Sequence, residues 1–148
     1  MPTPFHDLDD YIAIPRLSGL RLSPDGSRLI VGVQHLDPKK TAYRSTIWEI
    51  DPAGDRPARR LTRSAPGESG AGFAADGSVL FTSKRPDADA ESSDDQEVAL
   101  WLLPAGGGEA RLVAERPGGI GGFAVAEGAG TLVVSAPTLP GTTTADED

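Results

Sequence analysis

A serine flanked by glycines is the residue of this chain whose surroundings come closest to a catalytic pattern. The stretch GESGA, residues 67–71, approaches the Gly-x-Ser-x-Gly nucleophile elbow, in which a serine on a sharp strand-to-helix turn attacks a carbonyl carbon. The last position is Ala71 instead of glycine, and the stretch falls between two sequence repeats. We therefore interpret it as a connecting loop and expect Ser69 not to act as a nucleophile.

The two histidines, His6 and His35, are the next candidates for acid–base chemistry or metal binding. A hydrolytic triad needs a histidine beside a nucleophile and an acid, and a metal site usually needs three or four clustered ligands. We expect His6 on a helix and His35 near the end of a strand, as surface or packing residues. The chain has no cysteine, which excludes disulfides, thiol catalysis and Cys-liganded zinc. We predict no catalytic residue and no metal site in this chain.

Two glycine-rich stretches, GAGFAA at residues 70–75 and GIGGFA at residues 119–124, fit a loose dinucleotide-binding fingerprint. That fingerprint requires a strand before it and a helix after it, because the helix N-terminus holds the pyrophosphate. In both places a strand pattern follows, at the same point of a repeat. We expect structural glycines and no bound cofactor.

An acidic stretch runs from Asp87 to Glu97 and reads DADAESSDDQE. Its alternating acids resemble the start of a calcium-binding loop, but glycine is absent from the sixth position and glutamate from the twelfth. A solvated loop between two strands is the expected structure. A weak calcium site or a contact with a basic peptide remains open.

The charge and hydropathy of the chain exclude several partners. The formal net charge is −8, which disfavours binding to nucleic acid because phosphates are neutralised by clustered lysines and arginines. The N-terminus lacks the basic region and apolar run of a signal peptide. No segment approaches the roughly 20 apolar residues of a membrane span. We expect no nucleic acid or membrane partner and a cytoplasmic location.

The elements that must position these residues repeat along the chain. The hairpin LRLSPDGSRLIV, residues 20–31, returns as GFAADGSVLFTS, residues 72–83, and its turn residues Asp25 and Asp76 are 51 residues apart. Tryptophan-containing strands recur with Trp48 and Trp101 at matching places, which predicts that both side chains fill the core between sheets. A third copy begins near residue 122 and stops after its second strand.

Each copy predicts short strands with β-branched or aromatic residues bounded by turns. An amphipathic helix is expected ahead of them over residues 4–13, capped by Thr3 and ended by Pro15. The expected strands are residues 19–22, 28–34, 45–51 and 58–62 in the first copy, 72–74, 78–83, 98–103 and 110–113 in the second, and 122–124 and 130–135 in the third.

A period of about 50 residues with four strands per copy is the signature of a β-propeller blade. A β-sandwich is the alternative arrangement for alternating strands. We predict an all-β partial propeller: an N-terminal helical segment over 1–17, blade 1 over 18–67, blade 2 over 68–118, and the start of blade 3 with a polar acidic end over 119–148.

With these motifs in view, the chain resembles a known family. The opening DLDDYIAIPRLSGLRLSPDGSRLIVGV and the blade ends IWEIDPAGDRPARRLT and LWLLPAGGGEARLV resemble the N-terminal propeller of prolyl oligopeptidase-type serine peptidases, in the acylaminoacyl-peptidase and dipeptidyl-peptidase branch. The propeller of TolB-type proteins has the same blade pattern. The peptidase resemblance implies a propeller that restricts access of peptide substrates to a C-terminal α/β-hydrolase domain, which supplies the serine nucleophile and against which the N-terminal helix packs.

Three functions follow from these expectations. The first is the N-terminal propeller fragment of such a serine peptidase, inert alone, with the hydrolase domain of the same protein as its partner. The second is a TolB-like module that binds a protein and performs no chemistry. The third is a small β protein whose copies assemble to close a ring.

Overall fold

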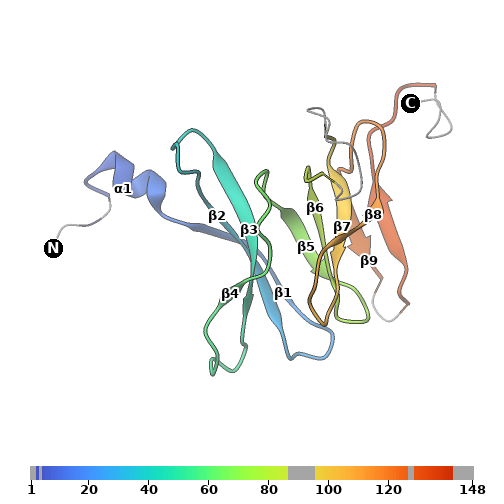
Figure 1. Ribbon diagram of the computed structural model, residues 1–148, viewed down its shortest axis with the longest axis horizontal. Coiled ribbons are helices and arrows are strands. Elements are labelled where there is room, and N and C mark those ends of the chain that lie inside the picture. Colours follow the sequence, from blue (N-terminus) through green and yellow to red (C-terminus); the bar gives the residue numbers. More distant parts are fainter. Residues whose placement is uncertain (1–2, 4, 87–95, 127–128, 142–148) are drawn as a thin grey trace.

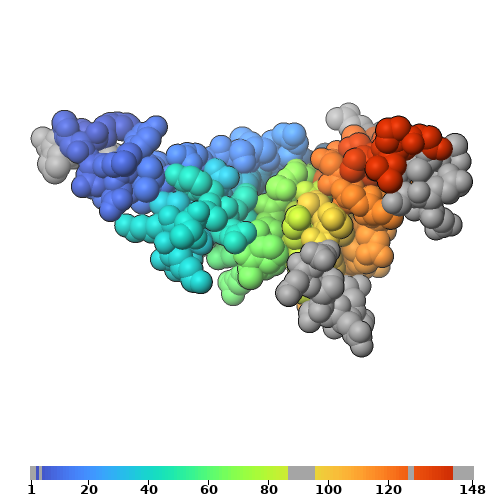
Figure 2. All heavy atoms as spheres, turned by 90° about the horizontal axis from the view of Figure 1, so that it is seen from above, coloured from blue at the N-terminus to red at the C-terminus, as the bar shows by residue number. Residues whose placement is uncertain are grey.

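Three antiparallel sheets follow one another along the long axis of the molecule in the order of the sequence, after one short helix (Figure 1). The structure is a computed structural model and describes residues 3, 5–86, 96–126 and 129–141. In a space-filling view from above, the described part of the chain is elongated from its first residues to its last (Figure 2).

Each sheet consists of strands that are consecutive in the sequence. The helix is α1 (Leu8–Ala13). Blade 1 has the strand order β1 (Arg16–Leu22), β2 (Leu29–Leu36), β3 (Tyr43–Ile50) and β4 (Arg59–Arg60). Blade 2 has the order β5 (Ser69–Phe73), β6 (Val79–Ser83), β7 (Ala99–Leu103) and β8 (Arg111–Ala114). The start of blade 3 is the pair β9 (Gly122–Val125) and β10 (Leu132–Ser135).

This topology is that of a partial β-propeller. A sandwich exchanges strands between its two sheets, whereas here every sheet is a simple four-stranded or two-stranded meander. The first strands β1, β5 and β9 contact one another in sequence, so the blades meet at their first strands. The predicted fold class is therefore confirmed, and each predicted strand is present with its ends displaced by a few residues.

The helix begins later than the sequence pattern predicts. It starts at Leu8 and is capped by Asp7, whose Oδ1 accepts hydrogen bonds from the backbone N–H groups of Asp9 (2.8 Å) and Asp10 (3.2 Å). The predicted start at residue 4 and the Thr3 cap are wrong, because the Asp7 carboxylate satisfies the free N–H groups of the first turn. The helix ends at Ala13, before Pro15, as predicted.

Two apolar clusters lie between the sheets. The first joins blade 1 to blade 2, with Ile30 and Ile47 packed against Phe81 and Trp101. The second joins blade 2 to the start of blade 3 around Leu100 and Ile120. Neither face of blade 2 is left to solvent, which is why its strand β6 is buried along its whole length.

Trp101 confirms its predicted core position, since it is 3% exposed. Trp48 is only half-buried and belongs to neither cluster, so the prediction of a core residue is wrong for it within the described residues. The reason is its direction: the partner of Trp48 across the sheet is Val31, and both face away from blade 2.

The connection between blades uses the same backbone arrangement twice. After blade 1, Gly67 has φ of 88° and the next residue, Glu68, donates its N–H to the Ser45 carbonyl over 2.9 Å. After blade 2, Gly119 has φ of 83° and Ile120 donates to the Val98 carbonyl over 2.6 Å. Such φ values favour glycine. A Cβ on Gly67 would stand 2.9 Å from the Ser45 carbonyl oxygen, so the close approach also needs glycine.

Candidate functional site

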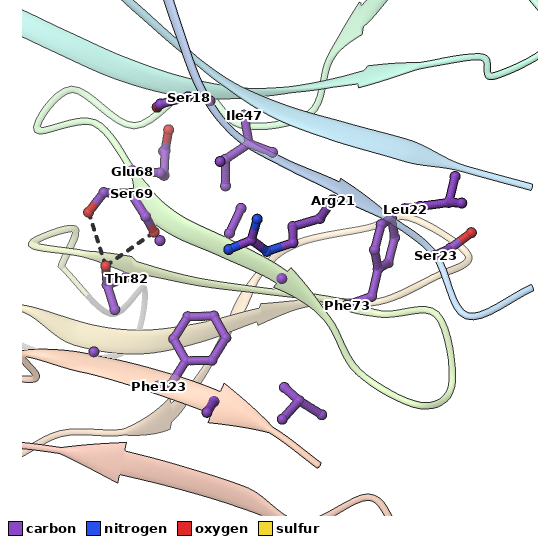
Figure 3. A pocket seen from close by; sticks show the side chains of 18 of the residues that line it. Ser18, Arg21, Leu22, Ser23, Ile47, Glu68, Ser69, Phe73, Thr82 and Phe123 are labelled. Atoms are coloured by element: carbon purple, nitrogen blue, oxygen red, sulfur yellow. Dashed lines mark hydrogen bonds between the residues drawn. The ribbon is translucent and has the colours of Figure 1, made fainter. Parts of the chain in front are cut away.

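The first strands of the three sheets line a hollow of about 1030 Å³ (Figure 3). Its wall consists mainly of residues from β1, β5 and β9, together with single residues of β2 and β6 and two residues of β3. In a propeller the blades surround a central channel. Because the blades of this chain meet at their first strands, the hollow is one sector of such a channel wall.

Glycines in this wall allow the first strands to approach one another closely. Gly19 in β1 and Gly70 in β5 have φ of 64° and 61°, and each sits where the pairing register of its strand shifts. A glycine in the left-handed region at a register shift is typical of a β-bulge, which bends a strand and re-aims its side chains. Gly72 faces Phe123 of the next sheet, and a Cβ there would lie 3.3 Å from the ring. The bulges and glycines therefore let three first strands converge.

Arg21 is one of two charged residues that line the hollow in the described part of the chain. It comes from β1, is exposed, and extends into the hollow toward β5 (Figure 3). Its Nη1 donates to the neighbouring Leu20 carbonyl over 2.9 Å. By strand register Arg21 stands where the second repeat has Gly72 and the third has Ala124, so the long side chain occupies space that the other blades leave open.

Glu68 is the other charged residue of the wall, and its carboxylate is buried at 2% exposure. Oε2 accepts a hydrogen bond from Thr62 Oγ1 over 2.6 Å, and Oε1 accepts from the backbone N–H of Ser64 over 3.0 Å and from the Ser64 hydroxyl. A buried charge is tolerated when its lone pairs are satisfied. Glu68 therefore stabilises the loop after β4. Because its carboxylate oxygens already accept these hydrogen bonds, it is not available as a general base.

Ser69, the candidate nucleophile, lies beside Thr82 instead of a histidine. The Ser69 and Thr82 hydroxyl oxygens are 3.0 Å apart, and Thr82 Oγ1 also donates to the Ser69 carbonyl over 3.1 Å (Figure 3). Ser69 belongs to strand β5, and the next described element is strand β6 instead of a helix. A nucleophile elbow requires a turn into a helix, so this geometry is that of a strand residue.

The two histidines lie apart from the hollow. His6 is exposed ahead of α1, and His35 is half-buried on β2, opposite Arg44 of β3. Neither lines the hollow. Within the described ranges, no three His, Asp or Glu side chains come together in a way that would hold a metal ion.

The glycine-rich stretches form strands β5 and β9, which the sequence analysis expected. Most of the acidic stretch, residues 87–95, lies outside the described residues; Glu97 is described and is exposed. Among the described residues there is also no helix of the length and apolarity that crossing a membrane requires.

Arg21 and Glu68 were not singled out from the sequence, although the repeats hold a signal for both. Glu68 occupies the place of the apolar Ile120, and Arg21 occupies the place of the small residues Gly72 and Ala124. A charged residue that departs from its own repeat is a candidate for a local role. The equivalences become visible only once strand register and the blade connections are known.

Comparison with solved structures finds likenesses to this chain. A solved structure titled as that of a putative TolB from Agrobacterium tumefaciens has a TM-score of 0.43 and 27% identity over 66% of this chain. The chain corresponds to 32% of the length of that structure. No family model matches the chain, and no curated protein matches it. The propeller assignment stands on the strand order and the stacking of the blades.

Proposed function

We propose that this chain is the N-terminal part of a β-propeller that has no catalytic residue of its own and limits which peptides reach an α/β-hydrolase domain of the same protein. The opening and blade-end motifs support the family. The observation on which the proposal depends is the hollow lined by β1, β5 and β9, which offers a glycine-lined wall with one exposed cation, Arg21. A cytoplasmic location belongs to this proposal.

In this proposal the chain selects substrates by size and charge. The hollow is lined by three first strands that contact one another in sequence, and a peptide that enters it would meet their exposed side chains. Arg21 would attract a carboxylate of the peptide, since a guanidinium pairs with carboxylates through two parallel N–H groups. The acyl transfer itself would use a serine, a histidine and an acid of the hydrolase domain.

The helix offers a surface for that domain. Phe5 and Leu8 are 73% and 72% exposed, and Tyr11 is 48% exposed. The three side chains lie on one face of the N-terminal segment. Apolar side chains gathered on one face are typical of a surface that another domain or protein covers. Tyr43 holds the helix on blade 1 by donating its hydroxyl hydrogen to the Ile12 carbonyl over 2.9 Å.

A wall substitution in the intact protein tests the access role. Ala124 of β9 lines the hollow and is exposed, so Ala124→Trp narrows the wall. The matched control Val113→Trp adds the same side chain at an exposed position of β8, the last strand of blade 2. We expect Ala124→Trp to lower kcat/KM for long peptides more than for a short ester, and the control to change neither. Equal loss for both substrates would contradict the access role.

A second candidate is a TolB-like propeller that binds a protein and has no hydrolase domain; the exposed apolar face of α1 favours it equally. The coding sequence downstream of residue 148 separates the two. A Gly-x-Ser-x-Gly motif followed by an Asp and a His supports the peptidase, and its absence supports the binding module. Peptidase or esterase activity of the isolated chain above background would contradict both.

A further inference from the structure

Another hollow lies between blades 1 and 2, at their outer strands instead of their first strands. It is a groove of about 430 Å³, and it shares no lining residue with the hollow of the first strands. Blade 1 contributes residues 61–64, which follow β4, and blade 2 contributes Arg85, Leu103 and residues 108–110. We call it the outer groove. Pockets that bind small ligands have volumes of about 300–1,000 Å³, so the outer groove is large enough for a short segment of a ligand.

The floor of the outer groove is apolar. Leu103 is 9% exposed and belongs to the core between blades 1 and 2, and Leu61 and Ala110 pack against that core while they remain partly exposed. The groove is therefore the outer end of the interface between the two blades. An aliphatic side chain placed on this floor would extend that core outward and remove further apolar surface from water.

The hydroxyl groups of the groove already donate to other residues. Thr62 Oγ1 donates to Glu68 Oε2 over 2.6 Å and accepts a hydrogen bond from the N–H of Ile47 over 3.0 Å. The Ser64 hydroxyl donates to the other carboxylate oxygen of Glu68. A hydroxyl has one hydrogen to donate, so neither group can donate to a ligand. Within the described lining, the side-chain donors left for a ligand are the guanidinium groups of Arg63 and Arg85.

These two arginines make the outer groove a cationic place on an acidic protein, whose net charge is −8. Arg63 is exposed and forms no hydrogen bond or ion pair with another residue of the part that the structure describes. Arg85 is half-buried, and its guanidinium carbon lies 5.1 Å from the centre of the Trp101 ring. Stacking on an aromatic ring holds the planar guanidinium in place, which favours binding of a carboxylate through parallel N–H groups.

Glu109, also in the groove lining, shows how a carboxylate can lie there. Its Oε1 is 3.9 Å from Arg85 Nη2, which is longer than a hydrogen bond, and its side chain is 75% exposed. An exposed ion pair of this kind contributes about 0–1 kcal/mol, so a carboxylate with better geometry can displace it. Glu109 therefore competes only weakly with an acidic ligand.

We propose that the outer groove binds an extended acidic peptide segment of another protein. A carboxylate of the segment pairs with Arg63 and Arg85, where it displaces Glu109, and a neighbouring aliphatic side chain packs on Leu61 and Leu103. A small inorganic anion would leave the apolar floor uncovered, whereas an apolar peptide would leave the two guanidinium groups without an acceptor. The outer groove lies away from the first strands, so the proposal does not depend on the hydrolase domain.

The test is an NMR titration of the isotope-labelled 148-residue chain with two peptides of equal size, acetyl-Ala-Glu-Leu-Ala-amide and acetyl-Ala-Gln-Leu-Ala-amide. We expect the glutamate peptide to shift the resonances of residues 61–64 and 108–110, and the glutamine peptide to need at least a tenfold higher concentration. The free acid acetyl-Ala-Ala-Leu supplies the same carboxylate from a chain end; stronger shifts with it would support the site and assign it to a C-terminus. Equal weak shifts with all three peptides would overturn the proposal.

Arg63→Gln removes one cation without changing the core, because Arg63 is exposed. We expect its affinity for the glutamate peptide to fall about tenfold, as for the loss of one charge-assisted hydrogen bond. Arg116→Gln is the matched control, since Arg116 is exposed and does not line the groove. The control should bind the peptide like the wild type. Equal losses in the two variants would show that the overall charge of the protein, and not the groove, attracts the peptide.

Glu109→Gln should have the opposite effect. Removal of the competing carboxylate should raise the affinity for the glutamate peptide by roughly 2–5-fold. Glu115→Gln, which changes an exposed glutamate outside the groove lining, measures the effect of overall charge. An affinity that rises no more in Glu109→Gln than in Glu115→Gln would contradict the displacement. A phosphoserine peptide that binds where the glutamate peptide does not would also refute the proposal, because the groove would then recognise phosphoryl groups.

Discussion

The guanidinium of Arg28 donates a hydrogen bond to the carbonyl oxygen of Gly77 over 2.7 Å. The two residues are 49 positions apart and belong to the corresponding turns of blades 1 and 2. Another nitrogen of the same guanidinium lies 2.6 Å from Glu49 Oε2, within blade 1. Arg28 thus joins a largely buried carboxylate of one blade to the backbone turn of the next.

Removal of Arg28 should loosen the contact between blades 1 and 2. Glu49 is 9% exposed, and in Arg28→Ala the one cationic partner that it keeps among the described residues is Arg59, at 3.5 Å. Loss of one partner of a largely buried pair leaves the other charge poorly compensated, so we expect the free energy of unfolding to fall by about 2–3 kcal/mol. Urea denaturation measures it.

Arg59→Ala is the matched control for Arg28→Ala, because Arg59 is 68% exposed and meets the same carboxylate. An exposed pair contributes about 0–1 kcal/mol. If the two substitutions lower the free energy of unfolding equally, the contact of Arg28 with Gly77 adds nothing to the stability of the chain.

Gly67→Ala should destabilise the chain more than Gly54→Ala. Both glycines have positive φ, 88° and 79°, so both alanines meet about 1 kcal/mol of backbone strain. Only at Gly67 would the Cβ also stand 2.9 Å from the Ser45 carbonyl, where it displaces the connection between blades; at Gly54 nothing lies within 4 Å. Thermal unfolding of the two variants gives the comparison. Equal decreases in melting temperature would show that the connection between the blades accommodates the added methyl group without further cost.

Glu68→Gln should destabilise the chain although it preserves size. All three contacts of the carboxylate come from donors, namely the Thr62 hydroxyl and the N–H and hydroxyl groups of Ser64. In glutamine one carboxylate oxygen is replaced by an NH2 group, so an acceptor becomes a donor. Two donors then face each other in a buried place without a hydrogen bond, which costs about 1–3 kcal/mol. The control Glu115→Gln changes an exposed residue. Chemical denaturation that finds both variants at wild-type stability would contradict this account of Glu68.

Stability should fall in acid partly through Asp25. Hydrogen bonds from the Ser23 hydroxyl (2.6 Å) and from the N–H (3.0 Å) and hydroxyl (2.8 Å) of Ser27 lower the pKa of Asp25 from 3.8 to about 2. The folded chain therefore binds fewer protons than the unfolded chain between these values. The stabilisation is complete above about pH 4 and is lost as the pH falls through about 2.

Asp25→Asn removes this dependence on pH. Unfolding measured from pH 5 to pH 2 should fall less steeply for Asp25→Asn than for the wild type. Asp55→Asn, an exposed aspartate of another turn, serves as the control. A profile of Asp25→Asn parallel to the wild type would show that the turn hydrogen bonds do not stabilise the charged form.

The first hairpin shows where sequence comparison misaligned the repeat. When the two hairpins are aligned on Asp25 and Asp76, Arg28 stands opposite Val79. In the structure Leu29 and Val79 are the equivalent strand residues, since they pair with Leu22 and Phe73. Arg28 is an additional residue of the longer first turn. Identity along the sequence cannot show a one-residue difference in a turn, whereas the pairing of the strands does.

The sequence by itself determined the strands, their order and the repeat, because alternation of apolar residues, turn glycines and the stop at Pro15 act over a few residues. It also excluded cysteine chemistry. The tertiary structure alone decided which neighbour each face meets. Trp48 and Trp101 occupy the same place in their strands, yet one is half-buried and the other buried, because burial depends on whether a neighbouring sheet is stacked there. The Arg28–Gly77 contact and the exposure of Arg21 on the wall have the same origin: both arise from the packing of one blade against the next.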